Sequence, residues 1–449
     1  MDKQQARAVV SAIMTDVVAD LCLLSAIPSV AFPEFPSEPV IRAARATLDI
    51  LRRYGVENAR LLHIPNGYPS VYGEIAGPEG APTVMLYGHY DVQPAPVDQD
   101  WTTNPFEPVQ KNGRLYARGA ADAKSGILQH AAAIRAMGGN LPVGVKILIE
   151  GEEGTTSHLE AYVKAKPHLF QCDVLLINEL GNTSLDEPVI SKSGQRNVAC
   201  TIEVRTLDHP VHPGYYAGAA PDALVTLMET PAALTDEDEA AAMPGIALFD
   251  REGADSPDDL CRESSGVLDG VGYVGSGTLA TRLWSRTSVT LPGFDAPSVA
   301  EASNIPHASA GAGTSMRIAS GMDGEGQLAR LMRNLEDSVP YGVQVKDERG
   351  EVGQPFRART DGPALKAARK AMTEAFGREA HIIGSGASIP LLNTLEAAVP
   401  GAEFILWGAQ DVEHARIHGA DESVDLAELE RCIVAQVLFL HSYANSVAT

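Results

Sequence analysis

Three short apolar segments in the first half of the chain each end directly before a polar residue that could do chemistry. They are TVMLYG at 83–88, VKILI at 145–149 and DVLLI at 173–177, and helical patterns begin between them near Ser125 and Ser157. Apolar strands that alternate with helices form a mostly parallel sheet with helices on both faces. The pattern therefore predicts an α/β catalytic domain, a mostly parallel sheet sandwiched by helices.

The middle of the chain follows a different pattern. From about residue 195, segments such as NVACTIEVRT alternate apolar and polar residues, which is typical of a half-exposed strand. The apolar run EFILW at 403–407 then returns to the buried-strand pattern of the first half. We therefore predict that residues 1–194 and 356–449 form the two parts of one catalytic domain. Residues 195–355 are predicted to form an inserted α+β domain that serves as a lid and for dimerisation.

Composition narrows the classes of function. A chain of 449 residues usually folds as more than one domain. Its 35 basic and 58 acidic residues give a net charge of −23, and a field of that sign repels nucleic acid and anionic membranes. We expect neither as a partner. The five cysteines are scattered without a CxxC pair, which favours free thiols and a cytoplasmic location.

Side chains that could bind a metal ion follow the three predicted strands. In open α/β sheets, ligands bind beyond the carboxyl ends of the strands, so residues placed there meet in one crevice. Carboxylates gathered in this way repel one another unless a cation neutralises them. A mixture of imidazole and carboxylate ligands suits zinc and similar metals. The residues concerned are His89, Asp91, Glu150, Glu152, Glu153 and Glu179, together with Asp122 in a glycine-rich turn.

Spacing within this set indicates different roles for neighbouring residues. Asp91 lies two positions beyond His89 on an extended segment, so it can accept the second ring hydrogen of that histidine. Glu152 and Glu153 are adjacent, and their side chains therefore diverge. One of them can bind a metal ion while the other serves as a general base.

Three motifs resemble those of a family of co-catalytic metallopeptidases. GHYDVQP at 88–94 is similar to the family's GHxDVxP, and RGAADAKSG at 118–126 is similar to RGxxDxKxG. EGEEG, which begins at Glu150, is similar to the first half of EGxEExGS. The family includes carnosine-type dipeptidases, aminoacylases, carboxypeptidase G-type enzymes, acetylornithine deacetylases and succinyl-diaminopimelate desuccinylases. The chain most resembles the dipeptidase branch.

The resemblance implies two divalent metal ions per subunit, with zinc expected and manganese or cobalt as alternatives. It assigns one ion to His89 and Glu179 and the other to Glu153 and His418, with Asp122 bridging both. Glu152 is then the general base and Asp91 the residue that orients His89. The expected reaction is hydrolysis of an amide bond in a small substrate that has a free C-terminal carboxylate.

Residues of the inserted domain are expected to contact that substrate. DHPVHPGYYAG at 208–218 resembles a dipeptidase segment, which assigns His212 to the scissile carbonyl oxygen, from the partner subunit of a homodimer formed through the inserted domain. Arg317 is expected to bind the substrate carboxylate, and Ser388 and Asn304 are further candidate contacts.

Three functions remain open at this point. The first is a dipeptidase. The second is an N-acyl or N-carbamoyl amino acid amidohydrolase, or a carboxypeptidase, that uses the same site, because Ala123 and Glu179 resemble the deacylase branch. The third is a relative without catalysis that serves as a binding scaffold. It should have lost a metal ligand, and the assignment above finds all of them retained.

Overall fold

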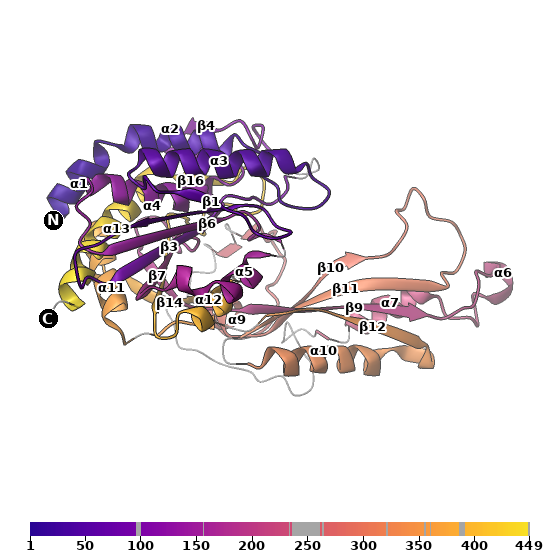
Figure 1. Cartoon of the computed structure of the whole chain (residues 1–449). Helices are drawn as coiled ribbons and strands as arrows, with labels where there is room; N and C mark the ends of the chain where they lie inside the picture. The colour runs from indigo at the N-terminus through magenta and orange to yellow at the C-terminus, as the bar shows by residue number, and fades with distance from the viewer. Residues whose placement is uncertain are drawn as a thin grey trace.

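The computed structural model describes residues 1–95, 100–155, 157–232, 234–235, 261–262, 265–319, 322–353, 356–359, 361–385 and 391–447. Within these residues, a nine-stranded sheet and a four-stranded sheet dominate the fold, and the smaller sheet projects from the larger part of the molecule (Figure 1). The predicted class, a mostly parallel α/β sheet with an inserted α+β region, is confirmed.

The large sheet is parallel at its centre and has antiparallel pairs toward both edges. Its order is β1-β2-β6-β3-β7-β15-β8-β13, with β14 beside β8. β3 pairs in parallel with β6 and with β7, and β7 pairs in parallel with β15. The strands are β1 (Arg60–Leu62), β2 (Ser70–Ile75), β3 (Thr83–His89), β6 (Gly144–Glu150), β7 (Val174–Ile177), β8 (Val189–Gly194), β13 (Phe356–Arg357), β14 (His381–Ser385) and β15 (Glu403–Leu406).

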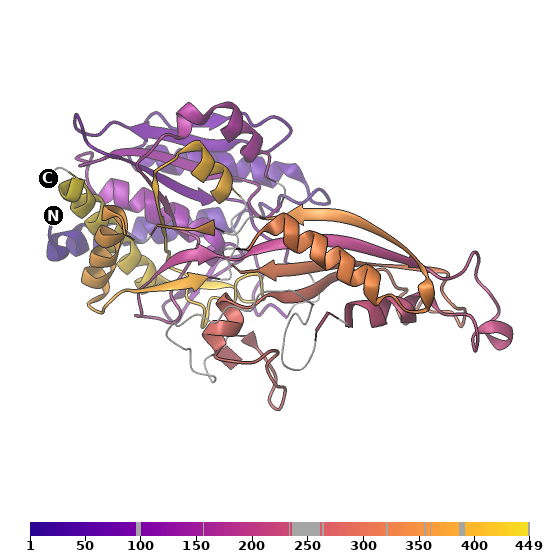
Figure 2. The same ribbon diagram turned by 90° about the horizontal axis from the view of Figure 1, so that it is seen from below.

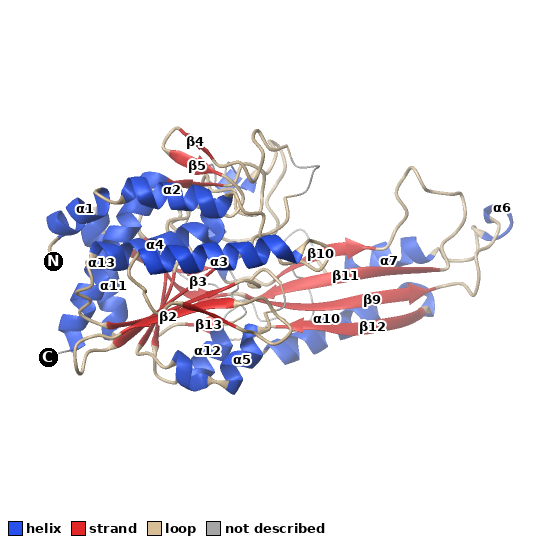
Figure 3. Cartoon of the chain, turned by 45° about the horizontal axis from the view of Figure 1, so that its top comes forward, coloured by secondary structure: helices blue, strands red, loops and turns tan. Residues whose placement is uncertain are grey.

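Helices cover both faces of this sheet (Figure 3). Alternate residues of β3 face opposite sides: Leu86 packs into one apolar core and Tyr87 into the other. The first core includes side chains of α1 (Lys3–Ser11), α2 (Met14–Ser25), α3 (Ser37–Arg53), α4 (Ser125–Ala136), α11 (Pro363–Phe376) and α13 (Leu426–Val447). The second core includes those of α5 (Leu159–Ala165) and α12 (Leu392–Ala398), beside the short helix η2 (Pro167–Phe170).

The covering helices follow from ordinary sequence signals. The buried residues of α3 recur at helical spacing, as Val40, Ala43, Ala44, Thr47, Ile50 and Leu51, so one stripe of the helix faces the core. α11 begins at Pro363 and ends before Gly377, whose φ is +75°. Proline at the start and a left-handed glycine after the end are typical helix boundaries.

No single helix among the described residues is long and apolar enough to cross a membrane. α1 and α2 meet the length and composition requirements only when taken together, across a bend of 55°.

A small third sheet joins two distant parts of the chain. It consists of β4 (Val109–Lys111), β5 (Arg114–Tyr116) and β16 (Ser423–Asp425), in the order β16-β5-β4. β5 and β16 pair antiparallel, with Tyr116 opposite Ser423. This pairing brings the segment after β5, which contains the short helix η1 (Ala120–Lys124), next to the segment before β16.

The four-stranded sheet lies between residues 196 and 352. Its antiparallel strands follow the order β10-β11-β9-β12, and α7 and α10 pack against one face (Figure 2). In β9 the buried residues Val198, Cys200, Ile202 and Val204 alternate with more exposed ones, as the sequence predicts. The predicted domain limits, residues 194 and 355, remain predictions. The elements are β9 (Arg196–Arg205), α6 (Pro213–Tyr216), α7 (Ala223–Ala232), α9 (Leu279–Trp284), β10 (Ser288–Phe294), β11 (Ser309–Ile318), α10 (Gly324–Ser338), η3 (Pro340–Gly342) and β12 (Gln344–Val352).

Candidate metal centre

The ends of three neighbouring parallel strands bring the predicted metal-binding residues together. β3 lies between β6 and β7, and its last residue, His89, stands opposite Glu150, the last residue of β6. β7 ends at Ile177, two residues before Glu179. The strands are therefore in register at their carboxyl ends, where α/β sheets place their ligands.

His89 lies at the centre of this group. Only 4% of its side chain is exposed, and its Nε2 atom lies 3.5 Å from Oδ1 of Asp122 and 4.0 Å from Oε2 of Glu153. The other ring nitrogen, Nδ1, lies 3.1 Å from the carbonyl oxygen of Asp91 and 3.4 Å from its Oδ1 atom. A proton on Nδ1 can therefore be donated to Asp91, which leaves the lone pair of Nε2 available to a metal ion.

Asp91 is itself fixed by the backbone. Its side chain is 2% exposed, and its two carboxylate oxygens accept hydrogen bonds from the N–H groups of Glu153, at 3.2 Å, and Gly154, at 3.0 Å. The structure thus places Asp91 behind His89, where the sequence predicts it.

Asp122 faces both histidines of the predicted set. Its Oδ1 atom points to His89, and its Oδ2 atom lies 2.9 Å from Nε2 of His418. Burial alone would raise the pKa of this carboxyl, but hydrogen bonds from His418 and His89 lower it below its ordinary value. A carboxylate between two imidazoles has the arrangement that a bridging ligand requires.

Glu153 and Glu179 complete a cluster of buried carboxyl groups. The positive charge near them is too small to keep their pKa values at the ordinary level. Burial raises the pKa of Glu153 to about 8, with His89 opposing the shift and Asp122 and Asp91 adding to it. Burial likewise raises the pKa of Glu179 well above its ordinary value, against the influence of His89, and the neighbouring Glu153 carboxyl adds to the shift. The Oε1 atom of Glu179 is buried without a hydrogen-bond partner.

These observations fit a divalent metal site. Imidazole nitrogen and carboxylate oxygen are ligands of zinc and of similar metals, and a cation would supply the partner that the buried Glu179 oxygen lacks. Within the part of the chain that the structure describes, no three of these side chains already form a complete metal-binding group.

The two adjacent glutamates, Glu152 and Glu153, have different neighbours in the structure. The carboxylate of Glu152 accepts hydrogen bonds from His158, with Oε1 at 3.1 Å from the ring Nδ1 and Oε2 at 3.4 Å from the backbone nitrogen. Its Oε2 atom also packs against Gly67, where an added Cβ would lie 2.4 Å away. Glu152 thus contacts His158, whereas the carboxylate of Glu153 lies 4.0 Å from the ring of His89.

The register of the third motif accounts for this outcome. When EGxEExGS is aligned from Glu150 without a gap, Glu153 takes the place of the first paired glutamate and Gly154 that of the second. The prediction places the pair one position earlier, at Glu152 and Glu153. The orientation of the side chains agrees with the ungapped alignment.

Several residues of the centre were not assigned a role from the sequence. Glu150 is buried, accepts a hydrogen bond from Tyr87 and another from Ser157 at 2.6 Å, and burial raises its pKa to about 7. Glu150 is the first residue of the third motif, and this position in the sequence could have identified it as part of the centre. His158 belongs to no motif, so only the structure reveals its contact with Glu152.

The predicted residues of the inserted domain lie elsewhere in the same chain. His212 is the exposed N-cap of α6, which lies at the far tip of the projecting sheet, away from β3 (Figure 1). His212 and Asn304 line the same hollow there. Arg317 is exposed on β11 opposite Asn197 of β9, at the end of this sheet that adjoins the large sheet. Ser388 lies outside the described residues.

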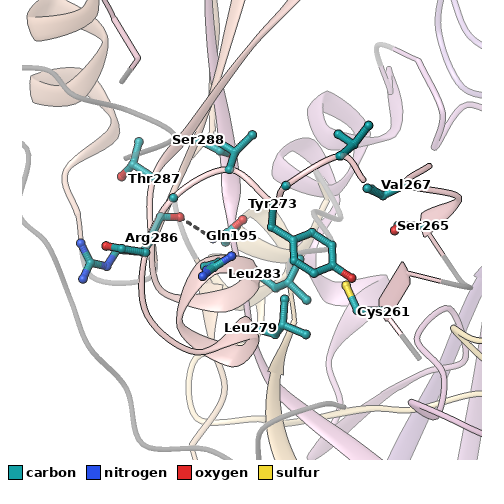
Figure 4. Close-up of a pocket in the computed structure, with 16 residues that line it drawn as sticks. Gln195, Cys261, Ser265, Val267, Tyr273, Leu279, Leu283, Arg286, Thr287 and Ser288 are labelled. Atoms are coloured by element: carbon teal, nitrogen blue, oxygen red, sulfur yellow. Dashed lines mark hydrogen bonds between the residues drawn. The ribbon is translucent and has the colours of Figure 1, made fainter. Parts of the chain in front are cut away.

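A separate cavity of about 460 Å³ lies near the base of the projecting sheet (Figure 4). Its wall is mostly apolar and includes Val267, Tyr273 and Leu279. At one side, the Gln195 side chain donates a hydrogen bond to the carbonyl oxygen of Arg286 at 3.1 Å. The cavity and the metal centre have no lining residue in common among the described residues.

Histidine and carboxylate side chains at the carboxyl ends of the strands of an α/β sheet form a candidate site for divalent metal ions. The sequence matches the model of peptidase family M20/M25/M40 over residues 85–442. The chain therefore belongs to this family of metallopeptidases, which confirms the predicted family and the predicted dependence on divalent metal ions.

Individual relatives support the same assignment. The chain is 34% identical to a cysteinylglycine-S-conjugate dipeptidase of Corynebacterium striatum, over 81% of this chain and 82% of the relative. Its fold matches that of human carnosine dipeptidase 1, with a TM-score of 0.86, 22% identity and 99% of both chains covered. It also matches the dipeptidase Dug1p of Saccharomyces cerevisiae, with a TM-score of 0.87, 18% identity, and 99% of this chain and 98% of the other covered. The predicted resemblance to the dipeptidase branch is confirmed.

Proposed function

We propose that the protein is a dipeptidase that hydrolyses the amide bond of a small substrate with a free C-terminal carboxylate. The observation that carries the proposal is the buried His89, which lies next to Asp122 and Glu153 at the carboxyl end of β3. The 34% identity to a dipeptidase over most of the chain supports this substrate class.

The centre would hold two divalent ions, with zinc as the expected metal and manganese or cobalt as alternatives. His89 and Glu179 would bind one ion and Asp122 would bridge the two. His418 would bind the other ion without the second glutamate of the third motif, because Gly154 takes that place and we assign Glu153 to proton transfer. When bound, such ions lower the pKa of a water molecule and polarise the substrate carbonyl. The protein itself orients His89 through Asp91 and keeps the donors within a largely buried group.

Glu153 is the residue that we assign to proton transfer. A general base must lie within reach of the reacting water, and Glu153 is oriented toward His89 whereas Glu152 is bound to His158. Glu153 would accept the proton of the attacking water and deliver it to the nitrogen of the leaving amine. Its buried position favours the first of these steps, because a raised pKa makes the carboxylate a stronger base toward the proton of the water.

The substrate would be positioned by the inserted domain. A guanidinium binds a carboxylate through two parallel hydrogen bonds, so Arg317 can fix the C-terminal carboxylate of the substrate. His212 lies at the tip of the projecting sheet, away from the centre of its own chain, so we assign it to the site of a second copy in a homodimer. Asn304, which lines the same hollow, would accompany it. The contact assigned to Ser388 and the cytoplasmic location remain predictions.

The proposal is tested with free dipeptides beside matched N-acetyl amino acids. Each substrate is assayed after chelation and again after addition of zinc, manganese or cobalt. Cleavage of the free dipeptides, restored by metal, is the expected result. Metal-dependent cleavage of the acylated substrates alone would instead identify an amidohydrolase, and absence of both activities would contradict the proposed substrate class.

A further inference from the structure

Arg118 and Glu422 form a buried ion pair next to the metal centre. The Nη1 atom of Arg118 lies 2.7 Å from Oε2 of Glu422, and each side chain is only 1% exposed. The two residues follow β5 and precede β16, the strands that pair in the small third sheet. The ion pair therefore joins two segments that are far apart in the sequence.

Glu422 holds the backbone of the Asp122 turn. Its Oε1 atom accepts hydrogen bonds from the N–H groups of Ala121, at 3.1 Å, and Asp122, at 3.0 Å. Because Oε2 is occupied by Arg118, the carboxylate has a fixed orientation and cannot rotate away from these donors.

Arg118 holds the backbone of the His418 turn. Its Nη2 atom donates to the carbonyl oxygens of His418, at 3.1 Å, and Pro94, at 3.2 Å. The guanidinium also lies over the ring of Trp101, with 5.3 Å between its carbon and the ring centroid. The planar group thus has few other orientations available.

We infer that Arg118 and Glu422 are positioning residues that set the relative placement of Asp122 and His418. Neither side chain has to touch a metal ion or the substrate for this role. Glu422 fixes the peptide that carries the bridging carboxylate, and Arg118 fixes the peptide that carries the exposed imidazole. Residues that orient metal ligands in this way commonly change metal affinity by roughly 10- to 100-fold when they are replaced.

The chain contains a matched control for this inference. Arg114 and Asp411 form a second buried ion pair at the same small sheet, with 2.7 Å between Nη2 and Oδ2 and exposed side-chain fractions of 9% and 0%. Arg114 also donates to the side chain and carbonyl oxygen of Ser423. Within the described part of the chain, the Arg114 side chain donates hydrogen bonds to Ser423 and Asp411 and not to Asp122 or His418. This pair therefore shares the burial and the sheet but not the contacts with the metal centre.

The experiment compares Arg118→Lys with Arg114→Lys in the full-length chain. A lysine keeps the positive charge, but it cannot present two nitrogens in the fork that reaches Glu422 and the His418 carbonyl together. Zinc and manganese are titrated into each chelated protein by calorimetry, and thermal melting is recorded in parallel. Glu422→Gln is measured as a second variant of similar shape, because it retains an oxygen acceptor for the two N–H groups.

Arg118→Lys is expected to weaken metal binding by about 10- to 100-fold, with a lower kcat and little change in KM. Arg114→Lys is expected to lower the melting temperature to a similar extent while metal affinity stays within about threefold of that of the unaltered protein. The metal affinity of Glu422→Gln should lie between those of the two lysine variants. Equal metal affinities in the two lysine variants would overturn the inference. This holds whether both variants bind metal more weakly than the unaltered protein or both bind it equally well.

The inference rests on the metal centre of the proposed function but not on its substrate. Metal binding is measured without any peptide present, so a failure to cleave dipeptides would leave this result unaffected. Conversely, the protein could prove to be an active dipeptidase while Arg118→Lys and Glu422→Gln bind metal with unchanged affinity. That result would contradict the positioning role alone.

Discussion

The Nε2 atom of His418 lies 2.9 Å from Oδ2 of Asp122, although 296 positions separate the two residues in the sequence. The other oxygen of the same carboxylate points to His89. The two histidines nevertheless differ in their surroundings, because the His89 side chain is 4% exposed and the His418 side chain is 58% exposed. His89 has carboxylate oxygens of three residues within 4.0 Å, whereas within the described part of the chain His418 has those of Asp122.

This difference predicts that two metal ions bind with unequal affinity. The position at His89 is buried and offers several carboxylates, so an ion there would be held more tightly than an ion at His418. A zinc titration of the chelated protein should therefore show two steps, separated by at least about tenfold in affinity. His418→Ala should remove the weaker step, and His89→Ala should remove the tighter one.

A single step for two ions, or loss of the tighter step in His418→Ala, would contradict this ranking. His63→Ala serves as the control, since that histidine is exposed and lies outside the centre.

The adjacent glutamates provide a second prediction. Glu153→Gln should retain bound metal but lose roughly 10²- to 10⁴-fold in kcat, because the amide cannot accept the proton of the attacking water. Glu152→Gln should stay within about tenfold of the original rate, since its carboxylate contacts His158 instead of the reacting group. Metal content and steady-state rates are measured for both variants side by side.

If Glu152→Gln instead lost more activity than Glu153→Gln, Glu152 would be the general base. Loss of metal from Glu153→Gln would instead make Glu153 a ligand, as the shifted reading of the third motif assigned it.

These two glutamates also show where the sequence was sufficient and where it was not. The strand ends at His89, Glu150 and Glu179 could be placed from apolar runs and motifs, because parallel strands necessarily bring their carboxyl ends together. The direction of Glu152 depends on the loop that contains Gly67 and on His158, neither of which carries a motif. Local spacing indicates that neighbouring side chains diverge, but it does not tell which of them faces the crevice.

The contact between Asp122 and His418 marks a similar limit. The family motifs pointed to both residues, but the pairing of β5 with β16 and the buried ion pair that holds the two turns are long-range features. Hydrophobic periodicity carries no information about which distant strands will pair. The sequence places Arg118 in the second motif and gives Glu422 no role, so it does not indicate that the two residues meet.

A buried histidine behind the centre gives a prediction about pH. His130 accepts hydrogen bonds at Nδ1 from Asn178 and Gln436, each at 3.1 Å, and can donate from Nε2 to the carbonyl oxygen of Tyr87 at 2.9 Å. Burial lowers its pKa to about 4. The unfolded chain, in which His130 titrates near 6.5, therefore binds more protons than the folded chain between pH 4 and 6.5.

Stability should accordingly rise with pH across that window, and His130 should contribute about 3 kcal/mol of the change. In His130→Gln the slope of unfolding free energy against pH should be smaller between pH 4.5 and 6.5, as measured by urea denaturation. His63→Gln is the matched control and should leave the slope unchanged. An identical slope in His130→Gln would show that His130 is not held neutral in the folded protein.

The position of His212 leads to a test with mixed subunits. Because α6 lies at the far tip of the projecting sheet, His212→Ala should abolish most activity without altering the metal content of its own chain. Glu153→Gln should be inactive for a different reason, in a different part of the chain. In a symmetric homodimer, each site would then combine Glu153 of one copy with His212 of the other.

Mixing the two inactive proteins under conditions that exchange subunits should therefore restore activity, up to about one quarter of the original value, since half of the dimers are mixed and each has one intact site. Activity should rise with the time course of subunit exchange, which is followed independently with differently labelled chains. A mixture that stays inactive after exchange is complete would place His212 outside the partner's site, whereas appreciable activity of His212→Ala alone would remove it from the reaction.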